Sequence, residues 1–208
     1  MTTKEQLTYS IQKTLEQAVV SRSLVELVEE VGIPYIDTVQ LPMLNIDKPW
    51  YVAHYLYPVY NGHPPASDWN LESMGNTDFD EPLGAPFNAL CTSAYNWGGN
   101  YGKIIQLLGF FKDGRLVLWT GWHLNRMSVT PGQFIRVGQD VGTIGDASGV
   151  YSAHLHEQIG YVEAGRGLPV PSMFSTNSTW CRWVDTVKFY QEYMDPAFVL
   201  KKAKFDKE

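Results

Sequence analysis

Clustered basic residues, long apolar stretches and a recognisable secretion signal are all missing from this chain of 208 residues. Its 16 lysines and arginines are outnumbered by 22 aspartates and glutamates, and no basic run with interleaved aromatic residues occurs, so we expect no nucleic-acid partner. No apolar stretch approaches the roughly 20 residues needed to cross a bilayer, so we expect no membrane insertion. The polar N-terminus lacks the charged and then apolar pattern of a secretion signal.

Cysteine and histidine are also scarce. The two cysteines, Cys91 and Cys181, lack the short spacing of a metal motif, so free thiols are expected. A His-Glu-x-x-His sequence is absent, which excludes the helical zinc-protease arrangement. A metal site would therefore draw on separate segments, and the available histidines are His54, His63, His123, His154 and His156.

His154 and His156, separated by Leu155, form the most informative pattern in the sequence. On a β-strand the two imidazoles point to the same face, about 7 Å apart from Cα to Cα, while Leu155 faces the core. One imidazole can then ligate a metal ion while the other reaches a group bound to that ion. An isolated pair would be better interpreted as two exposed strand histidines. Whether this pair belongs to a metal site therefore depends on ligands from other segments.

His63 and Asp68 lie in a proline-rich stretch that cannot be helical. They can bend round one ion as a nitrogen and an oxygen ligand. With His156 they form a set of two histidines and one aspartate, which leaves the open position typical of a catalytic zinc site. His54 alternates with aromatic residues and is interpreted as a strand or surface histidine.

Further motifs accompany this pair in a fixed order along the chain. They are residues 75–78 and 82–86, the glycine-rich stretch 97–102, Trp122 with His123, and residues 131–142, 144–149 and 154–156. Over residues 63 to 158 this ordered series resembles the lysostaphin-type (LytM-like) zinc metallopeptidases, which cut peptide cross-links in bacterial cell walls.

The resemblance implies a role for each matched residue. His63, Asp68 and His156 would ligate one Zn²⁺, and His154 and His123 would be the two catalytic histidines that are not ligands. Zinc would polarise the scissile carbonyl and acidify its bound water. One of the two histidines would accept a proton and the other would stabilise the oxyanion, and the sequence does not assign which does which. We expect activity to rise with a midpoint near about pH 6 to 7, where free imidazole titrates. An extended peptide would lie in a groove lined by Tyr151, Trp122, Trp97 and Tyr101.

Two positions depart from the family pattern. Four residues separate His63 from Asp68 where the family has three, so Asp78 and Asp80 are the alternative carboxylates. Glu157 stands where the family has an aromatic residue. Strand alternation directs Glu157 to the face opposite both histidines, so we expect it not to ligate the metal.

The expected fold is mainly β with minor α: an antiparallel sheet core of the lysostaphin type (a duplicated hybrid motif) with N-terminal helices and a C-terminal helix. Residues 4–31 have helical periodicity, and Asp195 followed by Pro196 predicts the final helix. Strands are predicted at residues 103–108, 116–120, 134–137 and 154–162, and a long loop at residues 164–179. We predict an N-terminal helical segment, residues 1–48, and a zinc metallopeptidase domain, residues 49–208.

The function that the resemblance implies is a zinc-dependent endopeptidase acting on cross-links or stem peptides of peptidoglycan, with no obligate protein partner. Without a secretion signal, such an enzyme resembles a bacteriophage endolysin, present in the host cytoplasm before release, or a virion-associated wall hydrolase. A bacterial enzyme is the alternative. Two rival functions are a non-catalytic binding or activator module of the same fold and a structural component of a phage virion.

Overall fold

The computed structural model describes residues 32, 34–55, 65–162, 181–194 and 203–205. These residues form mainly strands: β1 (Trp50–Tyr55), β2 (Ala66–Leu71), β3 (Pro82–Gly84), β4 (Ala89–Gly98), β5 (Gly102–Phe110), β6 (Leu116–Leu124), β7 (Arg126–Met127), β8 (Phe134–Ile135), β9 (Asp140–Thr143), β10 (Leu155–Val162), β11 (Cys181–Val184) and β12 (Ala203–Phe205). One helix, α3 (Thr186–Tyr193), is found in the described part of the chain.

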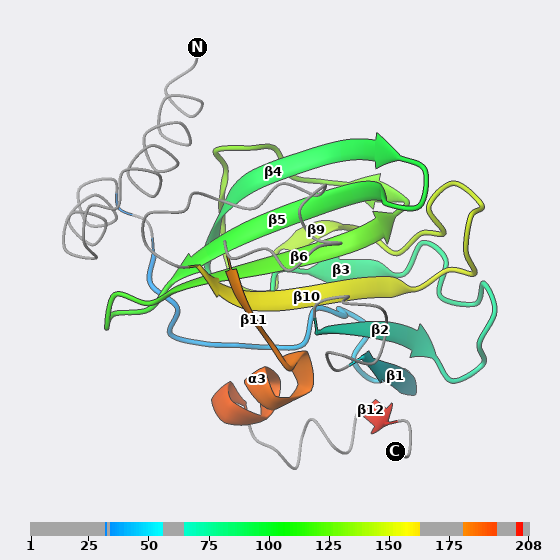
Figure 1. Ribbon diagram of the computed structural model, residues 1–208, viewed down its shortest axis with the longest axis horizontal. Coiled ribbons are helices and arrows are strands. Elements are labelled where there is room, and N and C mark those ends of the chain that lie inside the picture. Colours follow the sequence, from blue (N-terminus) through cyan, green and yellow to red (C-terminus); the bar gives the residue numbers. More distant parts are fainter. Residues whose placement is uncertain (1–31, 33, 56–64, 163–180, 195–202, 206–208) are drawn as a thin grey trace.

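Nine of the strands form one large sheet, in the order β12-β1-β2-β10-β6-β5-β4-β8, with β11 also paired to β10 (Figure 1). Neighbouring strands in it run antiparallel, except for the parallel pair β1 and β12. A second sheet of three strands has the order β3-β9-β7. The predicted mainly β, antiparallel fold is therefore confirmed.

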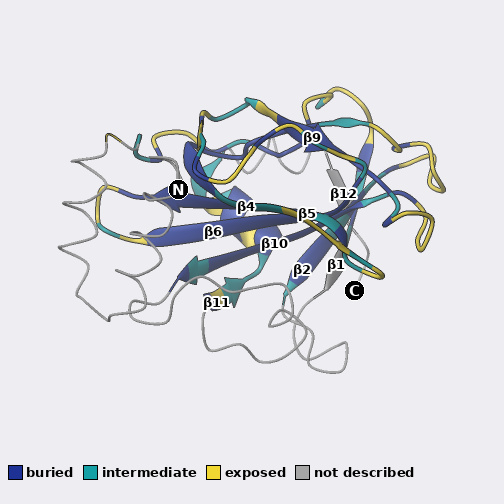
Figure 2. Cartoon of the chain, turned by 90° about the horizontal axis from the view of Figure 1, so that it is seen from above, coloured by how far each residue is buried: buried dark blue, intermediate teal, exposed yellow. Residues whose placement is uncertain are grey.

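The central strands of the large sheet are covered on both faces. All nine residues of β6 and seven of the eight residues of β10 are buried, and β6 is dark blue in Figure 2. A strand buried on both sides reads as a nearly continuous apolar run instead of an alternating one, which is how β6 reads in the sequence. These strands therefore lie at the buried centre of the fold.

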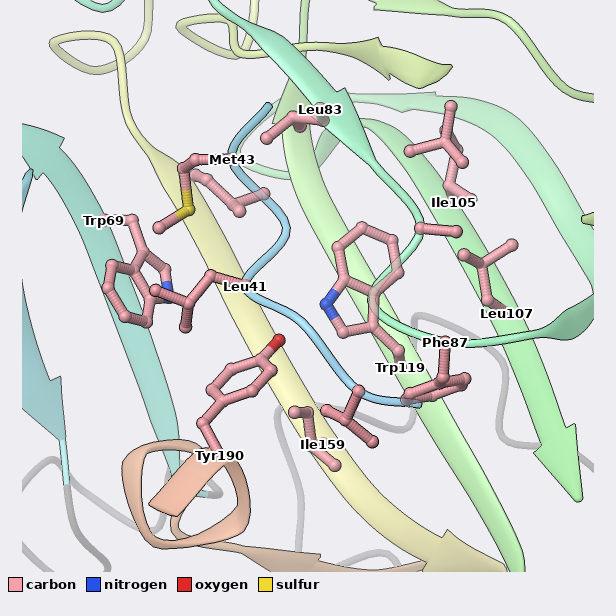
Figure 3. Close-up of a cluster of buried hydrophobic side chains, with 14 of the residues drawn as sticks. Leu41, Met43, Trp69, Leu83, Phe87, Ile105, Leu107, Trp119, Ile159 and Tyr190 are labelled. Carbon is pink, nitrogen blue, oxygen red and sulfur yellow. The ribbon is translucent and has the colours of Figure 1, made fainter. Parts of the chain in front are cut away.

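The main core lies on one face of the large sheet and is rich in aromatic residues. Trp69, Trp119 and Tyr190 are fully buried in it and converge from β2, β6 and α3 (Figure 3). Leu41 and Met43 also pack there, from a part of the predicted N-terminal segment that has no helix. The helices predicted within residues 4–31 lie outside the described residues, and the domain boundary after residue 48 stays a prediction.

Helix α3 was not predicted from the sequence. Asp185 caps its N-terminus by accepting a hydrogen bond from the backbone N–H of Lys188 at 2.9 Å. An aspartate before a segment with apolar residues at helical spacing is a recognisable signal for the start of a helix. The final helix predicted from Asp195 and the loop predicted at residues 164–179 lie outside the described residues. Over the described residues, no helix combines the length and apolar character needed to cross a membrane.

Candidate metal and catalytic centre

Asp68, His156 and Trp122 form a row across three neighbouring strands. Asp68 on β2 is directly opposite His156 on β10, and His156 is directly opposite Trp122 on β6. Opposed residues of antiparallel strands project from the same face with Cβ atoms about 5 Å apart. The register therefore gathers a carboxylate, an imidazole and an indole on the sheet face opposite the main core.

The carboxylate of Asp68 contacts two imidazoles. Nδ1 of His156 lies 2.7 Å from Oδ1 of Asp68, and Nε2 of His154 lies 3.8 Å from Oδ2. Because an ionised carboxylate only accepts hydrogen bonds, Nδ1 of His156 is the donor. Burial would raise the pKa of Asp68, but the charge and hydrogen bond of His156 and the charges of His154 and His123 together hold that pKa below its usual value.

His123, near the end of β6, has an unusual backbone conformation, with a φ of 63°. Its backbone N–H donates to the carbonyl of Tyr101, and its ring Nδ1 faces the same carbonyl, each at 3.2 Å. Its ring centroid is 4.8 Å from that of His154 and 5.6 Å from that of His156. A histidine with positive φ is strained, and such strain persists where the surroundings fix it. The Tyr101 carbonyl fixes His123 beside the other two imidazoles.

Gly145 allows the segment before His154 to approach β6 closely. Gly145 and His154 form an isolated bridge in which the N–H of His154 donates to the carbonyl of Gly145 at 3.2 Å. A side chain at Gly145 would overlap the backbone of His123 and Asn125. Glycine is thus needed to bring His154 beside His123, a requirement that only the tertiary structure reveals.

Hydrogen bonds assign the tautomers of the imidazoles when they are neutral. Nδ1 of His154 lies 2.8 Å from the carbonyl of Ser152, and Nδ1 of His123 faces the carbonyl of Tyr101. Because carbonyls only accept, each Nδ1 carries the hydrogen and each Nε2 keeps its lone pair. Burial, followed by the charges of His156 and His154, lowers the pKa of His123 to about 3. His123 is therefore neutral at physiological pH.

The donor atoms gathered here suit a zinc ion. One ring nitrogen from each of His123, His154 and His156 lies within 4.8 Å of the others, and Asp68 adds a carboxylate oxygen. Imidazole nitrogen and carboxylate oxygen are common ligands of Zn²⁺. His63, the third predicted ligand, lies outside the described residues. The structure thus brings together two of the three predicted ligands and both predicted catalytic histidines.

Three of the four aromatic residues predicted to bind substrate adjoin this cluster. The ring centroid of Trp122 is 5.4 Å from that of His156 and 5.4 Å from that of Tyr101. The centroid of Tyr151, which is 40 % exposed, lies 4.9 Å from that of His123. Their roles in binding stay predictions, but their positions make them the walls of the cluster.

The fourth aromatic residue, Trp97, lies farther out on β4 and packs against Tyr95, with ring centroids 5.7 Å apart. Both rings are exposed, by 42 % for Trp97 and 59 % for Tyr95. Tyr95 is opposite Ile104 on β5, and Ile104 packs against Trp122 on β6. The pair therefore continues the row of Trp122 outward by two strands, or about 10 Å. Tyr95 was not predicted as a site residue, although its alternation with Trp97 is a visible signal.

The alternative carboxylates have other surroundings. Asp80 accepts hydrogen bonds from Thr143 at 2.7 Å and Asn125 at 3.0 Å, and so anchors its loop. Asp78 is buried, and burial raises its pKa to about 6. Asp68 is the carboxylate that the structure places beside His156. Glu157 lies on the opposite face, as expected, among core side chains.

Comparisons with known proteins find distant likenesses of fold. No protein-family model matches the chain, and no curated protein matches it in sequence. Among solved structures, lysostaphin is 17 % identical over 83 % of this chain with a TM-score of 0.49, and the chain spans 57 % of its length. The catalytic domain of lysostaphin from Staphylococcus simulans is 20 % identical over 64 % of this chain and 94 % of the domain, with a TM-score of 0.38. A chain of the SpoIIIAH and SpoIIQ complex is 14 % identical over 73 % of this chain and 99 % of its own length, with a TM-score of 0.49. Likenesses this distant assign the chain neither a family nor an activity.

Proposed function

We propose that this chain is a zinc-dependent endopeptidase that hydrolyses peptide cross-links or stem peptides of bacterial peptidoglycan. The observation that carries the proposal is the convergence of Asp68, His123, His154 and His156 at one place on the sheet. The site includes a strained backbone at His123, and it needs a glycine at position 145, where any side chain would overlap neighbouring backbone. A sheet with a purely structural role needs neither feature. The substrate class comes from the ordered motifs that resemble the lysostaphin-type peptidases.

Asp68 and His156, together with His63, are the ligands that we propose for the ion. The set of His123, His154 and His156 is the competing assignment. A bound Zn²⁺ would supply a Lewis acid for the scissile carbonyl and would lower the pKa of water. Everything else in the reaction falls to side chains of the chain itself.

His154 and His123 receive different roles in the proposal. Nε2 of His154 faces Oδ2 of Asp68, so His154 is the histidine that can hold a proton next to a negative charge. We assign the proton transfer to His154. The pKa of His123, lowered to about 3, makes it a weak base, so its Nε2 lone pair orients a donor N–H or O–H of the reactants without taking the proton.

An extended peptide fits the sheet face that carries the row. Trp122 and Tyr151 would flank the reacting bond, because their rings contact His156 and His123. Tyr95 and Trp97 would hold a part of the substrate farther from that bond, because they lie two strands away from Trp122. Open aromatic surfaces of this kind are enriched in binding sites.

The decisive experiment is digestion of purified peptidoglycan sacculi, with released fragments identified by mass and bound zinc quantified. Wild type should release peptide fragments and carry one zinc ion. The variant His154→Ala should keep zinc and lose cleavage, whereas Asp68→Ala should lose both. Asp113→Ala, which removes an exposed aspartate paired with Arg115, should change neither and serves as the control.

The same proteins decide between the two ligand sets and between functions. Retention of zinc by His123→Asn would support His63, Asp68 and His156 as ligands, and loss of zinc would support the three histidines. If the wild-type protein carries no zinc and cleaves nothing, the proposal of an enzyme is contradicted and the non-catalytic binding module is favoured. If the protein cleaves sacculi, its location distinguishes two functions. Presence in the cytoplasm before lysis would support an endolysin, and presence in purified virions would support a virion-associated hydrolase.

A further inference from the structure

The two strands that carry Asp68 and His156 are also joined on their rear face, toward the main core. Next to the opposed pair of Asp68 and His156, the register opposes Ser67 on β2 to Glu157 on β10. Side chains alternate along a strand, so Ser67 and Glu157 point away from the histidines. Both are fully buried.

Helix α3 contacts both members of this rear pair. The hydroxyl of Tyr190 donates to Oε1 of Glu157 at 2.5 Å, and the hydroxyl of Thr186 is hydrogen-bonded to that of Ser67. Thr186 and Tyr190 are four residues apart and therefore lie on the same face of the helix. Both side chains are fully buried. One face of α3 is thus hydrogen-bonded to one residue of β2 and to one residue of β10.

Two indoles complete the surroundings of Glu157. The ring N–H of Trp69 donates to Oε2 of Glu157 at 2.8 Å, and that of Trp119 donates to Oε1. Gly121 is opposite Glu157 on β6, and a side chain there would overlap the Trp119 ring. Figure 3 shows the Tyr190 ring projecting from α3 between the two indoles. The carboxylate thereby ties β10 to β2, β6 and α3.

The strands need such a connection because their backbone ladder is short. β2 and β10 are paired over three residues, Leu155 to Glu157 on β10, and β11 pairs with β10 from Ile159 onward. A slip of one residue would turn Asp68 to the rear face. A ladder of three pairs offers few backbone hydrogen bonds against such a slip, so the buried side-chain contacts on the rear face add to the definition of the register.

We propose that α3 is a register clamp for the metal centre, in which Tyr190 and Thr186 act as positioning residues through Glu157 and Ser67. The clamp keeps Asp68 opposite His156 and so presents both as ligands. Its relevance to zinc rests on the proposed function, but its effect on the contact between Asp68 and His156 does not.

The test compares three proteins that retain their ring packing. Tyr190→Phe removes one clamping hydroxyl, and the double variant Tyr190→Phe/Thr186→Val removes both. Tyr193→Phe is the matched control, because its hydroxyl lies on the same helix but is bonded to Arg115 and Tyr161 instead of Glu157. If the double variant does not fold, the single variant decides.

Two measurements are made on each protein. The first is the zinc Kd by competition with a chromophoric chelator, which should rise about tenfold in Tyr190→Phe and stay within about twofold in Tyr193→Phe. The second is the pair of ring ¹⁵N shifts of His156 in the metal-free protein at about pH 8, where free imidazole is neutral. Wild type and Tyr193→Phe should show the Nδ1–H tautomer held by Asp68, and Tyr190→Phe should show a mixture of tautomers.

If wild type binds zinc, the clamp predicts that Tyr190→Phe changes both the zinc Kd and the ring ¹⁵N shifts of His156. An unchanged value of either quantity in Tyr190→Phe would overturn the clamp. A fall in thermal stability alone, equal in Tyr190→Phe and Tyr193→Phe, would mean that the hydroxyl only stabilises the core. If wild type binds no zinc, the proposed function fails and the ¹⁵N shifts alone decide the clamp.

Discussion

Asp68 and His156 hold one hydrogen between them, with Oδ1 and Nδ1 2.7 Å apart at directly opposed positions of β2 and β10. If these two atoms held a metal ion, the ion would take the place of that hydrogen. If the chain binds zinc as proposed, this relationship links folding, metal content and activity, because the same two side chains would take part in all three.

Removing the metal should therefore lower stability as well as activity. A chelator should abolish cleavage of sacculi and lower the Tm of wild type, by an amount equivalent to about 4 kcal/mol if free zinc was about 1,000 times its Kd. Readdition of zinc should restore both. Calorimetry with and without chelator makes the measurement. Asp68→Ala should show the same Tm in both conditions, and a chelator effect in that variant would remove Asp68 from the ligand set.

Burial of His123 should make the metal-free protein sensitive to acid. Its folded pKa, about 3, lies below the value of about 6.5 for an exposed imidazole, so between these two values the unfolded state binds the extra proton. Stability should accordingly be intact above about pH 6.5 and fall as the pH drops toward about 3. His123→Asn, whose side chain tolerates a positive φ and does not titrate, should show a flatter profile of Tm against pH.

The lowered pKa of His123 also corrects an expectation from the sequence. The activity midpoint predicted at about pH 6 to 7 was argued from the titration of free imidazole, and burial takes His123 out of that range. Its ring carbon-bound proton should show no NMR titration between about pH 8 and 5. A midpoint near 6.5 would contradict the environment described above.

Gly145→Ala should impair the site without unfolding the protein. The new Cβ would overlap the backbone of His123 and Asn125, so the segment carrying His154 must move away. We expect kcat to fall by about 100-fold, in line with the cost of displacing a catalytic group by about 1 Å. Gly149→Ala is the control, because no atom lies within 4 Å of the new Cβ there, although its φ of 87° adds a backbone strain that Gly145 does not have. A loss in Gly149→Ala as large as that in Gly145→Ala would contradict a specific effect of the overlap at Gly145.

The aromatic pair on β4 should contribute to substrate binding. Tyr95→Ala and Trp97→Ala should each raise KM several-fold with little change in kcat, because β4 lies two strands, or about 10 Å, away from Trp122 and the proposed reacting bond. Phe134→Ala is the control, because Phe134 is also an exposed aromatic residue of the large sheet, on β8 at its edge. Steady-state kinetics on a cross-linked muropeptide would measure the effect. A fall in kcat alone would place the pair nearer to the chemistry than proposed.

The sequence by itself determined the strand character of the chain and the pairing of functional residues within single segments. His154 and His156 share a face because strand side chains alternate, and Glu157 faces the other way for the same reason. These are local consequences of chain geometry. The helix at Thr186–Tyr193 also has a local signal in the sequence, the N-terminal cap Asp185.

The residues themselves did not show which distant side chains meet: only the resemblance to a known family predicted the set, and the tertiary structure brings its described members together. Three residues that are far apart in sequence, Asp68, His123 and His156, come together through strand register and through the carbonyl of Tyr101. Burial then sets the pKa of His123, and Tyr190 of α3 contacts Glu157 behind His156. No local pattern specifies these outcomes, because register and burial depend on the packing of the whole sheet.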